Sequence, residues 1–69
     1  MNNIDLRYRY QIPNKLVLDM SILGKEKINM YIDDRLIQTI MVKRSKAYEV
    51  LSNINKQIIQ KEKEVDIWQ

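Results

Sequence analysis

The 69-residue sequence predicts a single α+β domain spanning residues 1–69, with about four antiparallel strands in a β-meander followed by one long amphipathic helix packed on one face of the sheet. Two observations predict this fold. Apolar and polar residues alternate with a period of two before residue 33, and the period becomes that of a helix after Ser45. A single Gly, a single Pro and 45% hydrophobic residues indicate an ordered chain rather than a disordered one.

The first predicted strand covers residues 4–12, where apolar and polar residues alternate without exception. The proline at position 13 ends it, because proline has no N–H group to donate to a sheet. We expect one face of this strand to be buried and the other to be open to solvent. The inward face carries Ile4, Leu6, Tyr8, Tyr10 and Ile12.

The second and third predicted strands cover residues 16–23 and 27–32, and both alternate in the same way. Gly24, the only glycine, favours a turn between them, because glycine adopts a positive φ without strain. Residues opposite each other in an antiparallel pair must share a face. This rule pairs Ile22 with Ile28 and predicts a three-residue loop that begins at Gly24.

The fourth predicted strand, residues 36–42, carries apolar residues on both faces, and two lengths of the preceding loop at Asp33-Asp34 fit the pattern. With a two-residue loop, the inward side chains are Ile37, Thr39 and Met41. With a three-residue loop, they are Leu36, Ile40 and Val42. A strand that is apolar on both faces is typical of a central strand or of one covered by another chain. Because this strand ends the meander, we expect a second copy to cover it and predict a homodimer.

The predicted helix covers residues 46–66, with Ser45 as its expected N-cap. Its apolar residues fall on one stripe at about 100° per residue, and this stripe should pack on the inner face of the sheet. Tyr48 and Ile59 lie together on a flank outside the stripe, where a partner could contact them. The stripe consists of Ala47, Val50, Leu51, Ile54, Ile58, Val65 and Trp68.

The composition disfavours several classes of function. The absence of Cys and His excludes disulfides and any thiolate or imidazole metal site, and so short a chain cannot enclose a deep reaction pocket. We therefore expect a non-enzymatic protein with no catalytic residue, no metal and no cofactor. Because no apolar run is long enough to span a bilayer and the first residues lack the pattern of a signal peptide, we expect a cytoplasmic protein with no membrane partner.

Positive charge is concentrated in residues 1–46, which hold nine Lys and Arg against five Asp and Glu. Residues 43–46, Lys-Arg-Ser-Lys, place three cations at the start of the predicted helix, where the helix dipole disfavours them. They could bind a phosphate, or they could simply be solvated side chains. The open face of the first three strands offers further cations and a tyrosine. The candidate nucleic-acid-binding residues are Arg7, Arg9, Lys27, Tyr31, Lys43, Arg44 and Lys46.

Two classes of function fit these features. The first is a small, homodimeric nucleic-acid-binding protein, such as a DNA-binding regulator of transcription. The alternative is a small inhibitor or adaptor of the kind that phages and plasmids carry, which would bind a host protein through the fourth strand and the end of the helix. The residues expected at the dimer or partner interface are Leu36, Ile40, Val42, Tyr48, Ile59 and Trp68.

Overall fold

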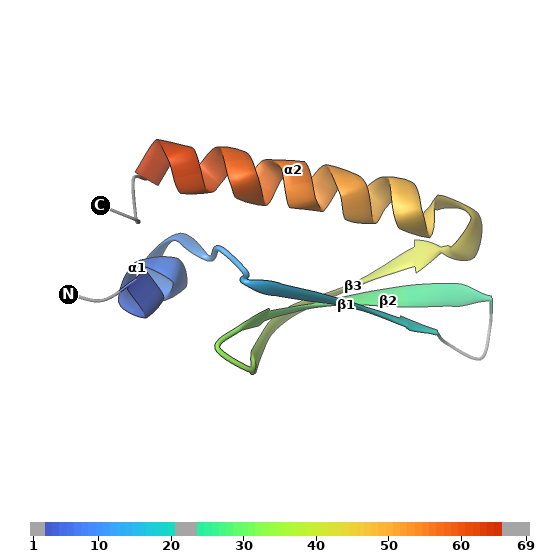
Figure 1. The fold of residues 1–69 in the computed structure, drawn as a ribbon. Coiled ribbons are helices and arrows are strands. Elements are labelled where there is room, and N and C mark those ends of the chain that lie inside the picture. Colours follow the sequence, from blue (N-terminus) through green and yellow to red (C-terminus); the bar gives the residue numbers. More distant parts are fainter. Residues whose placement is uncertain (1–2, 21–23, 66–69) are drawn as a thin grey trace.

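The structure, a computed structural model, describes residues 3–20 and 24–65. Its three strands form one antiparallel sheet in the order β1-β2-β3, and the long helix α2 lies along one face of this sheet (Figure 1). The predicted α+β class and the long C-terminal helix are confirmed. The elements are α1 (Asn3–Tyr10), β1 (Lys15–Met20), β2 (Lys25–Ile32), β3 (Arg35–Lys43), the 3₁₀ turn η1 (Arg44–Lys46) and α2 (Ala47–Val65).

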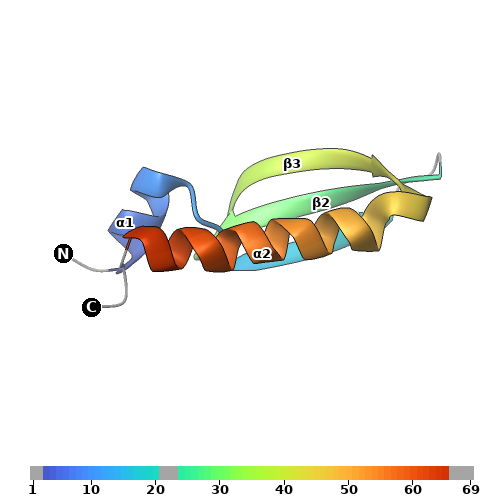
Figure 2. The same cartoon turned by 90° about the horizontal axis from the view of Figure 1, so that it is seen from above.

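The predicted strand at residues 4–12 is wrong, and the meander has three strands instead of four. Most of this segment forms α1, which lies at one end of the sheet beside the end of α2 (Figures 1 and 2). The helix ends in a Schellman motif, in which the N–H of Ile12 donates to the carbonyl of Arg7 at 2.9 Å and the N–H of Gln11 donates to that of Tyr8 at 3.4 Å. Gln11 adopts the left-handed conformation of this motif, with a φ of 54°.

The pairing of β1 with β2 differs from the predicted register. Leu18, rather than Ile22, lies opposite Ile28, and Met20 lies opposite Glu26. The difference is an even number of residues, so the same side chains still face inward. Ile22 and the rest of the predicted strand beyond Met20 lie outside the described residues. Gly24 has a φ of 73°, the conformation for which a glycine was expected at this position.

The hairpin between β2 and β3 combines features of the two predicted alternatives. Its loop has two residues, Asp33-Asp34, with φ values of 49° and 67° that match a type I′ turn. A β-bulge then follows, because Tyr31 lies opposite Leu36 whereas Met30 lies opposite Gln38. The extra residue reverses the alternation of β3. Its inward side chains are therefore Gln38, Ile40 and Val42.

Burial is deepest along the inner face of the central strand β2, where Ile28 and Ile32 are fully buried and Met30 is nearly so. The inner residues of the two edge strands, such as Leu16 and Ile40, are only half-buried. One helix, about 10 Å wide, is too narrow to cover three strands with their side chains. Of the predicted helix stripe, Ala47 is buried, Val50, Leu51, Ile54, Ile58 and Val65 are half-buried, and Trp68 lies outside the described residues.

The start of α2 differs from the prediction. Lys43 is the N-cap residue of the 3₁₀ turn η1 that precedes α2, with an extended ψ of 141° and no capping hydrogen bond from its side chain. The 3₁₀ turn η1 then leads into α2, which begins at Ala47. Ser45 lies inside this turn, where its hydroxyl does not cap the helix.

Candidate functional site

The candidate site is the sheet face opposite α2, which we call the outer face. No helix lies on it in Figure 1, since α2 follows the other face and α1 is at one end of the sheet. The alternation of each strand and the cross-strand pairs define which side chains it carries. They are Lys15, Val17, Asp19, Lys25, Lys27, Asn29, Tyr31, Leu36, Thr39, Met41 and Lys43.

The outer face is strongly cationic, because it carries four lysines and a single acid, Asp19. Lys25 lies directly opposite Lys43 in the ladder, an arrangement of like charges that destabilises a sheet. Among the described residues, neither Lys27 nor Lys43 forms an ion pair. Departures from locally favourable pairing concentrate at functional sites, so this end of the outer face is a candidate for anion binding.

Apolar side chains also lie on the outer face, on the same cross-strand rungs as two of its lysines. Leu36 is 57% exposed and Met41 is 54% exposed, and both lie on β3. Tyr31 lies opposite Leu36. The Nζ of Lys15 is 5.4 Å from the centroid of the Tyr31 ring, within the range of a cation–π contact. This ammonium is also 3.5 Å from an exposed carboxylate oxygen of Asp34. The outer face therefore presents a half-buried aromatic ring and two exposed apolar side chains beside its cations.

The three cations at the start of α2 do not converge on one site. Lys43 belongs to the outer face, whereas the Nε of Arg44 is 3.3 Å from the Oε1 of Glu26, on the inner face of β2. The Nζ of Lys46 is 3.5 Å from the Oε2 of Glu49, one turn along α2. The carboxylates of Glu26 and Glu49 offset two of the three charges. The three side chains therefore do not surround a single phosphate-sized site. Of the three, only Lys43 shares the outer face with Lys27.

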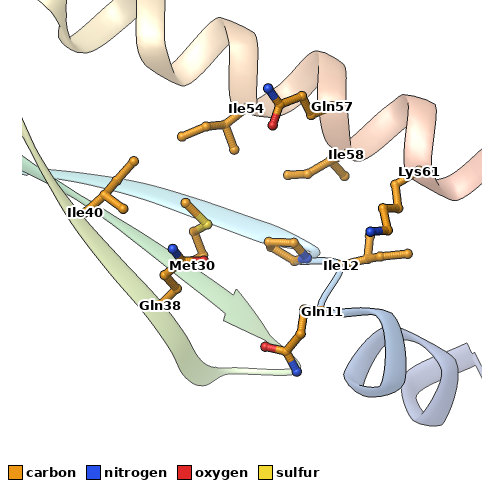
Figure 3. Close-up of a pocket in the computed structure, with 10 residues that line it drawn as sticks. Gln11, Ile12, Met30, Gln38, Ile40, Ile54, Gln57, Ile58 and Lys61 are labelled. Carbon is orange, nitrogen blue, oxygen red and sulfur yellow. The ribbon is translucent and has the colours of Figure 1, made fainter.

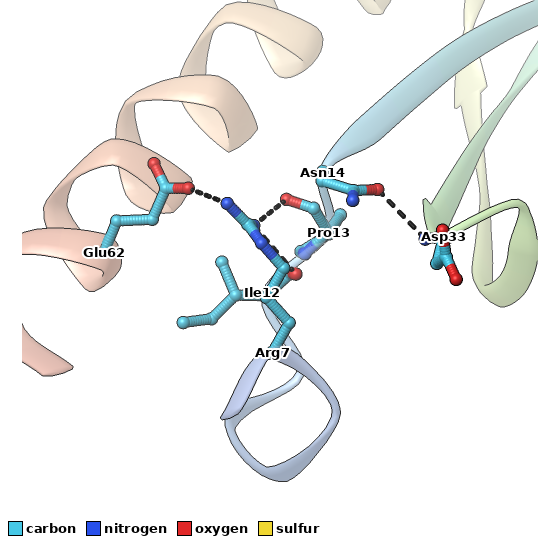
Figure 4. A network of polar contacts seen from close by, with 6 residues as sticks. All are labelled: Arg7, Ile12, Pro13, Asn14, Asp33 and Glu62. Atoms are coloured by element: carbon cyan, nitrogen blue, oxygen red, sulfur yellow. Dashed lines mark hydrogen bonds and ion pairs between the residues drawn. The ribbon is translucent and has the colours of Figure 1, made fainter. Parts of the chain in front are cut away.

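Arg7 and Arg9 do not lie on a sheet face, so their expected placement is wrong. The guanidinium of Arg7 is buried and forms an ion pair with Glu62 of α2 at 2.5 Å (Figure 4). It also donates to the carbonyls of Ile12 at 3.3 Å and Pro13 at 3.1 Å. Arg7 therefore fastens α1 and the following loop to α2. Arg9 is exposed on α1, which lies at one end of the sheet.

Two acidic residues that form ion pairs were not predicted from the sequence. One pairs with a buried arginine, and the other is itself buried on the inner face of the sheet. Glu62 stands four residues after Ile58, on the same helix face, and binds Arg7. Glu26 has the parity of Ile28 and is 7% exposed, with Arg44 as its partner. In both cases the signal was an acid in an apolar periodic pattern, which indicates a basic partner elsewhere in the chain.

The residues expected at a dimer or partner interface lie on separate surfaces. Leu36 is on the outer face, whereas Ile40 and Val42 are half-buried on the inner face of β3. Tyr48, 77% exposed, and Ile59, 46% exposed, are on α2 and line gaps on its other side, toward Leu16 of β1. Trp68 lies outside the described residues. These residues therefore do not form one continuous patch.

A cavity of about 290 Å³ lies between α2 and β3 (Figure 3). Apolar side chains of both elements line it, with Lys61 and the amide groups of three glutamines beside them. This lining holds no carboxylate or hydroxyl group that could exchange a proton with a substrate. The cavity is the space that one narrow helix leaves over an edge strand. Its lining residues are Gln11, Ile12, Pro13, Met30, Gln38, Ile40, Ile54, Gln57, Ile58 and Lys61.

Comparison with known proteins found no matching family model, no matching curated protein and no matching solved structure. Within residues 3–20 and 24–65, neither helix has both the length and the apolar character that crossing a bilayer requires.

Proposed function

We propose that this chain is a small nucleic-acid-binding protein whose outer face contacts the phosphate backbone. The observation that carries the proposal is a sheet face on which neither α1 nor α2 lies and which carries four lysines against one aspartate. A bound polyanion would place negative charge beside Lys25 and Lys43, which lie opposite each other in the ladder. Release of counterions from the nucleic acid would supply the free energy of binding.

The exposed side of α2 is a weaker candidate for this contact, because its charges have mixed sign. Lys56 and Lys63 are exposed there together with Glu49 and Glu64. Alternating charges of this kind are typical of a solvated helix face. A protein that binds through the outer face would act by occupying the nucleic acid, as regulators of transcription do. The alternative, a protein-binding inhibitor or adaptor, has less support, since its expected contact residues lie on separate surfaces.

Replacement of both Lys27 and Lys43 by alanine is expected to weaken nucleic-acid binding and to reduce its dependence on salt. Each lysine that no longer neutralises a phosphate lowers the slope of log K against log salt concentration by about 0.7 on a single strand and about 0.9 on a duplex. The double variant should therefore lose about 1.4 to 1.8 from this slope. Fluorescence anisotropy of labelled oligonucleotides over a series of salt concentrations measures both effects.

The matched control is the double variant of Lys56 and Lys63, two exposed lysines of α2 on the other side of the molecule. Its net charge equals that of the first variant, but its affinity and salt slope should stay close to those of the original protein. Equal losses in the two variants would mean that only the overall charge matters. No binding by the original protein at low salt would refute the proposed function.

We also propose that the chain forms a homodimer through β3. This edge strand has nine residues, and the stretch between Arg35 and Lys43 contains neither a charge nor a proline. Such an edge offers unpaired backbone groups to another strand. The half-buried inner side chains Ile40 and Val42 would lose further contact with water in a pair. Opposition of two outer faces is disfavoured, because it would bring two sets of lysines together.

Sedimentation equilibrium at micromolar concentration is expected to give twice the chain mass of 8.4 kDa. Replacement of Thr39 by lysine should shift this equilibrium toward monomer, because it places a charge on the exposed part of the edge strand. Replacement of Gln60 by lysine, at an exposed position of α2, should leave the mass unchanged. A stable monomer of the original chain would contradict the dimer.

A further inference from the structure

The outer face carries exposed apolar groups that phosphate binding alone does not use. Leu36 and Met41 are each more than half exposed, and Tyr31, which is half-buried, lies opposite Leu36. In contact with phosphates, Leu36 and Met41 would gain nothing, because apolar surface is stabilised only when it leaves water against other apolar surface. The flat faces of unpaired bases provide such a surface, and bases stack on aromatic side chains without regard to sequence.

Double-stranded nucleic acid does not offer these base faces. In a duplex the bases are stacked on one another, and the outer surface consists of phosphates and sugars. The major groove, about 12 Å wide, admits a helix or a two-stranded ribbon. Three strands about 4.8 Å apart with α2 behind them are too broad to enter it. A duplex lying across the outer face would therefore meet its lysines and leave Leu36 and Met41 unburied.

The order of side chains along the strands suits a single strand lying across the sheet. Lys25, Lys27 and Lys43 gather at one end of the outer face, and Lys15 lies at the other end beside Tyr31. Between these ends the Oγ1 of Thr39 donates a hydrogen bond of 2.8 Å to the Oδ1 of Asn29. Each end thus places cations beside a surface that can receive bases. Tyr31 and Leu36 share the rung of Lys15, and Met41 lies opposite Lys27.

From this arrangement we infer that the outer face binds single-stranded nucleic acid in preference to a duplex, with phosphates on the lysines and bases on Tyr31, Leu36 and Met41. This inference rests on the proposed nucleic-acid-binding function and names the class of ligand for the same face. It requires that part of the affinity come from apolar contact, which salt does not screen. The affinity for a single strand should therefore remain measurable at salt concentrations where duplex binding is lost.

The test uses fluorescence anisotropy with a labelled 12-nucleotide single strand and with the same strand annealed to its complement, each titrated at several salt concentrations. The original protein should bind the single strand at least about tenfold more tightly than the duplex. The Leu36→Ala and Met41→Ala double variant should lose about five- to tenfold in affinity for the single strand, with an unchanged salt slope. Its duplex binding should not change.

Replacement of Tyr31 by alanine should reduce single-strand affinity by about tenfold or more, and replacement by phenylalanine should retain it, because stacking needs the ring and not the hydroxyl. Circular dichroism verifies that each variant is folded, and the exposed positions of Leu36 and Met41 keep the test valid if the Tyr31 variant unfolds. Two results would overturn the inference and leave the nucleic-acid-binding function in place. One is that the duplex binds as tightly as the single strand or more tightly. The other is that the Leu36 and Met41 double variant keeps its affinity for the single strand. Failure to bind either oligonucleotide would overturn both.

Discussion

Replacement of Ile28 by alanine is expected to destabilise the fold strongly. Ile28 is fully buried in the middle of β2, with Leu18 opposite it on β1 and Ile40 opposite it on β3. A change from isoleucine to alanine at such a site costs about 2–5 kcal/mol, because it removes apolar contact and leaves a cavity. A chain of this length has a total stability of roughly 3–10 kcal/mol, so a large unfolded fraction is expected.

Urea denaturation followed by circular dichroism measures this cost. Replacement of Ile28 by valine should cost only about 1 kcal/mol, since one methylene group is lost. Replacement of Met20 by alanine, at a position 69% exposed, should change the stability by less than about 0.5 kcal/mol. If the alanine variants at positions 20 and 28 have equal stability, then β2 is not the centre of the core.

The second large effect is expected from replacement of Arg7 by alanine. The side chain of Arg7 is 6% exposed, and its removal leaves Glu62 and the carbonyls of Ile12 and Pro13 without this partner. Loss of one member of a buried ion pair costs about 3 kcal/mol, because the remaining charge is poorly hydrated. Urea denaturation should report this loss. Hydrogen exchange should report faster exchange of the α1 amides than in the original protein.

Arg9 supplies the control, because it is exposed on the same helix and its replacement by alanine should have little effect. The double variant of Arg7 and Glu62 should be less destabilised than the sum of the two single variants, as expected for residues in direct contact. Additive effects would argue against the ion pair. If the folded Arg7 variant keeps its affinity for nucleic acid, Arg7 stabilises the attachment of α1 to α2 and does not take part in binding.

The sequence was sufficient to predict the segments that form the sheet and the long helix. Alternation of apolar residues indicated where β1 and β2 lie, because each strand buries one face. The apolar run at residues 36–42 indicated β3. It did not decide which face of β3 is inward. The bulge beside Tyr31 reverses the alternation after the two-residue turn, and a bulge of this kind leaves no residue type that identifies it.

The helix α1 could not be predicted from local sequence, because its residues alternate as those of a strand do. Its end is marked by Gln11 in a left-handed conformation, where a glycine would have signalled the end of a helix. The contact that fastens it joins Arg7 to a residue 55 positions away. A tertiary contact over that distance outweighs local preference and is invisible to a short sequence window.

The candidate site was predicted in part. Lys27 and Tyr31 lie on the outer face, as the parity of β2 predicted, and Lys43 joins them there. Lys15 and Lys25 were not expected on this face, because the predicted strands begin after them. Leu36 and Met41 were each expected on it under only one of the two loop lengths, and the bulge brings both there. The pairing of Lys46 with Glu49 could have been anticipated, since residues three apart are neighbours on a helix.

The edge strand β3 also determines how these experiments must be run. Its interior from Leu36 to Val42 combines branched and apolar residues with no charge and no proline, the composition of segments that stack into fibrils. Partial unfolding of any core variant would release this stretch from the native sheet. Insoluble protein would then remove unfolded molecules from the equilibrium, so denaturation curves should be recorded at several low protein concentrations and accepted only when they coincide.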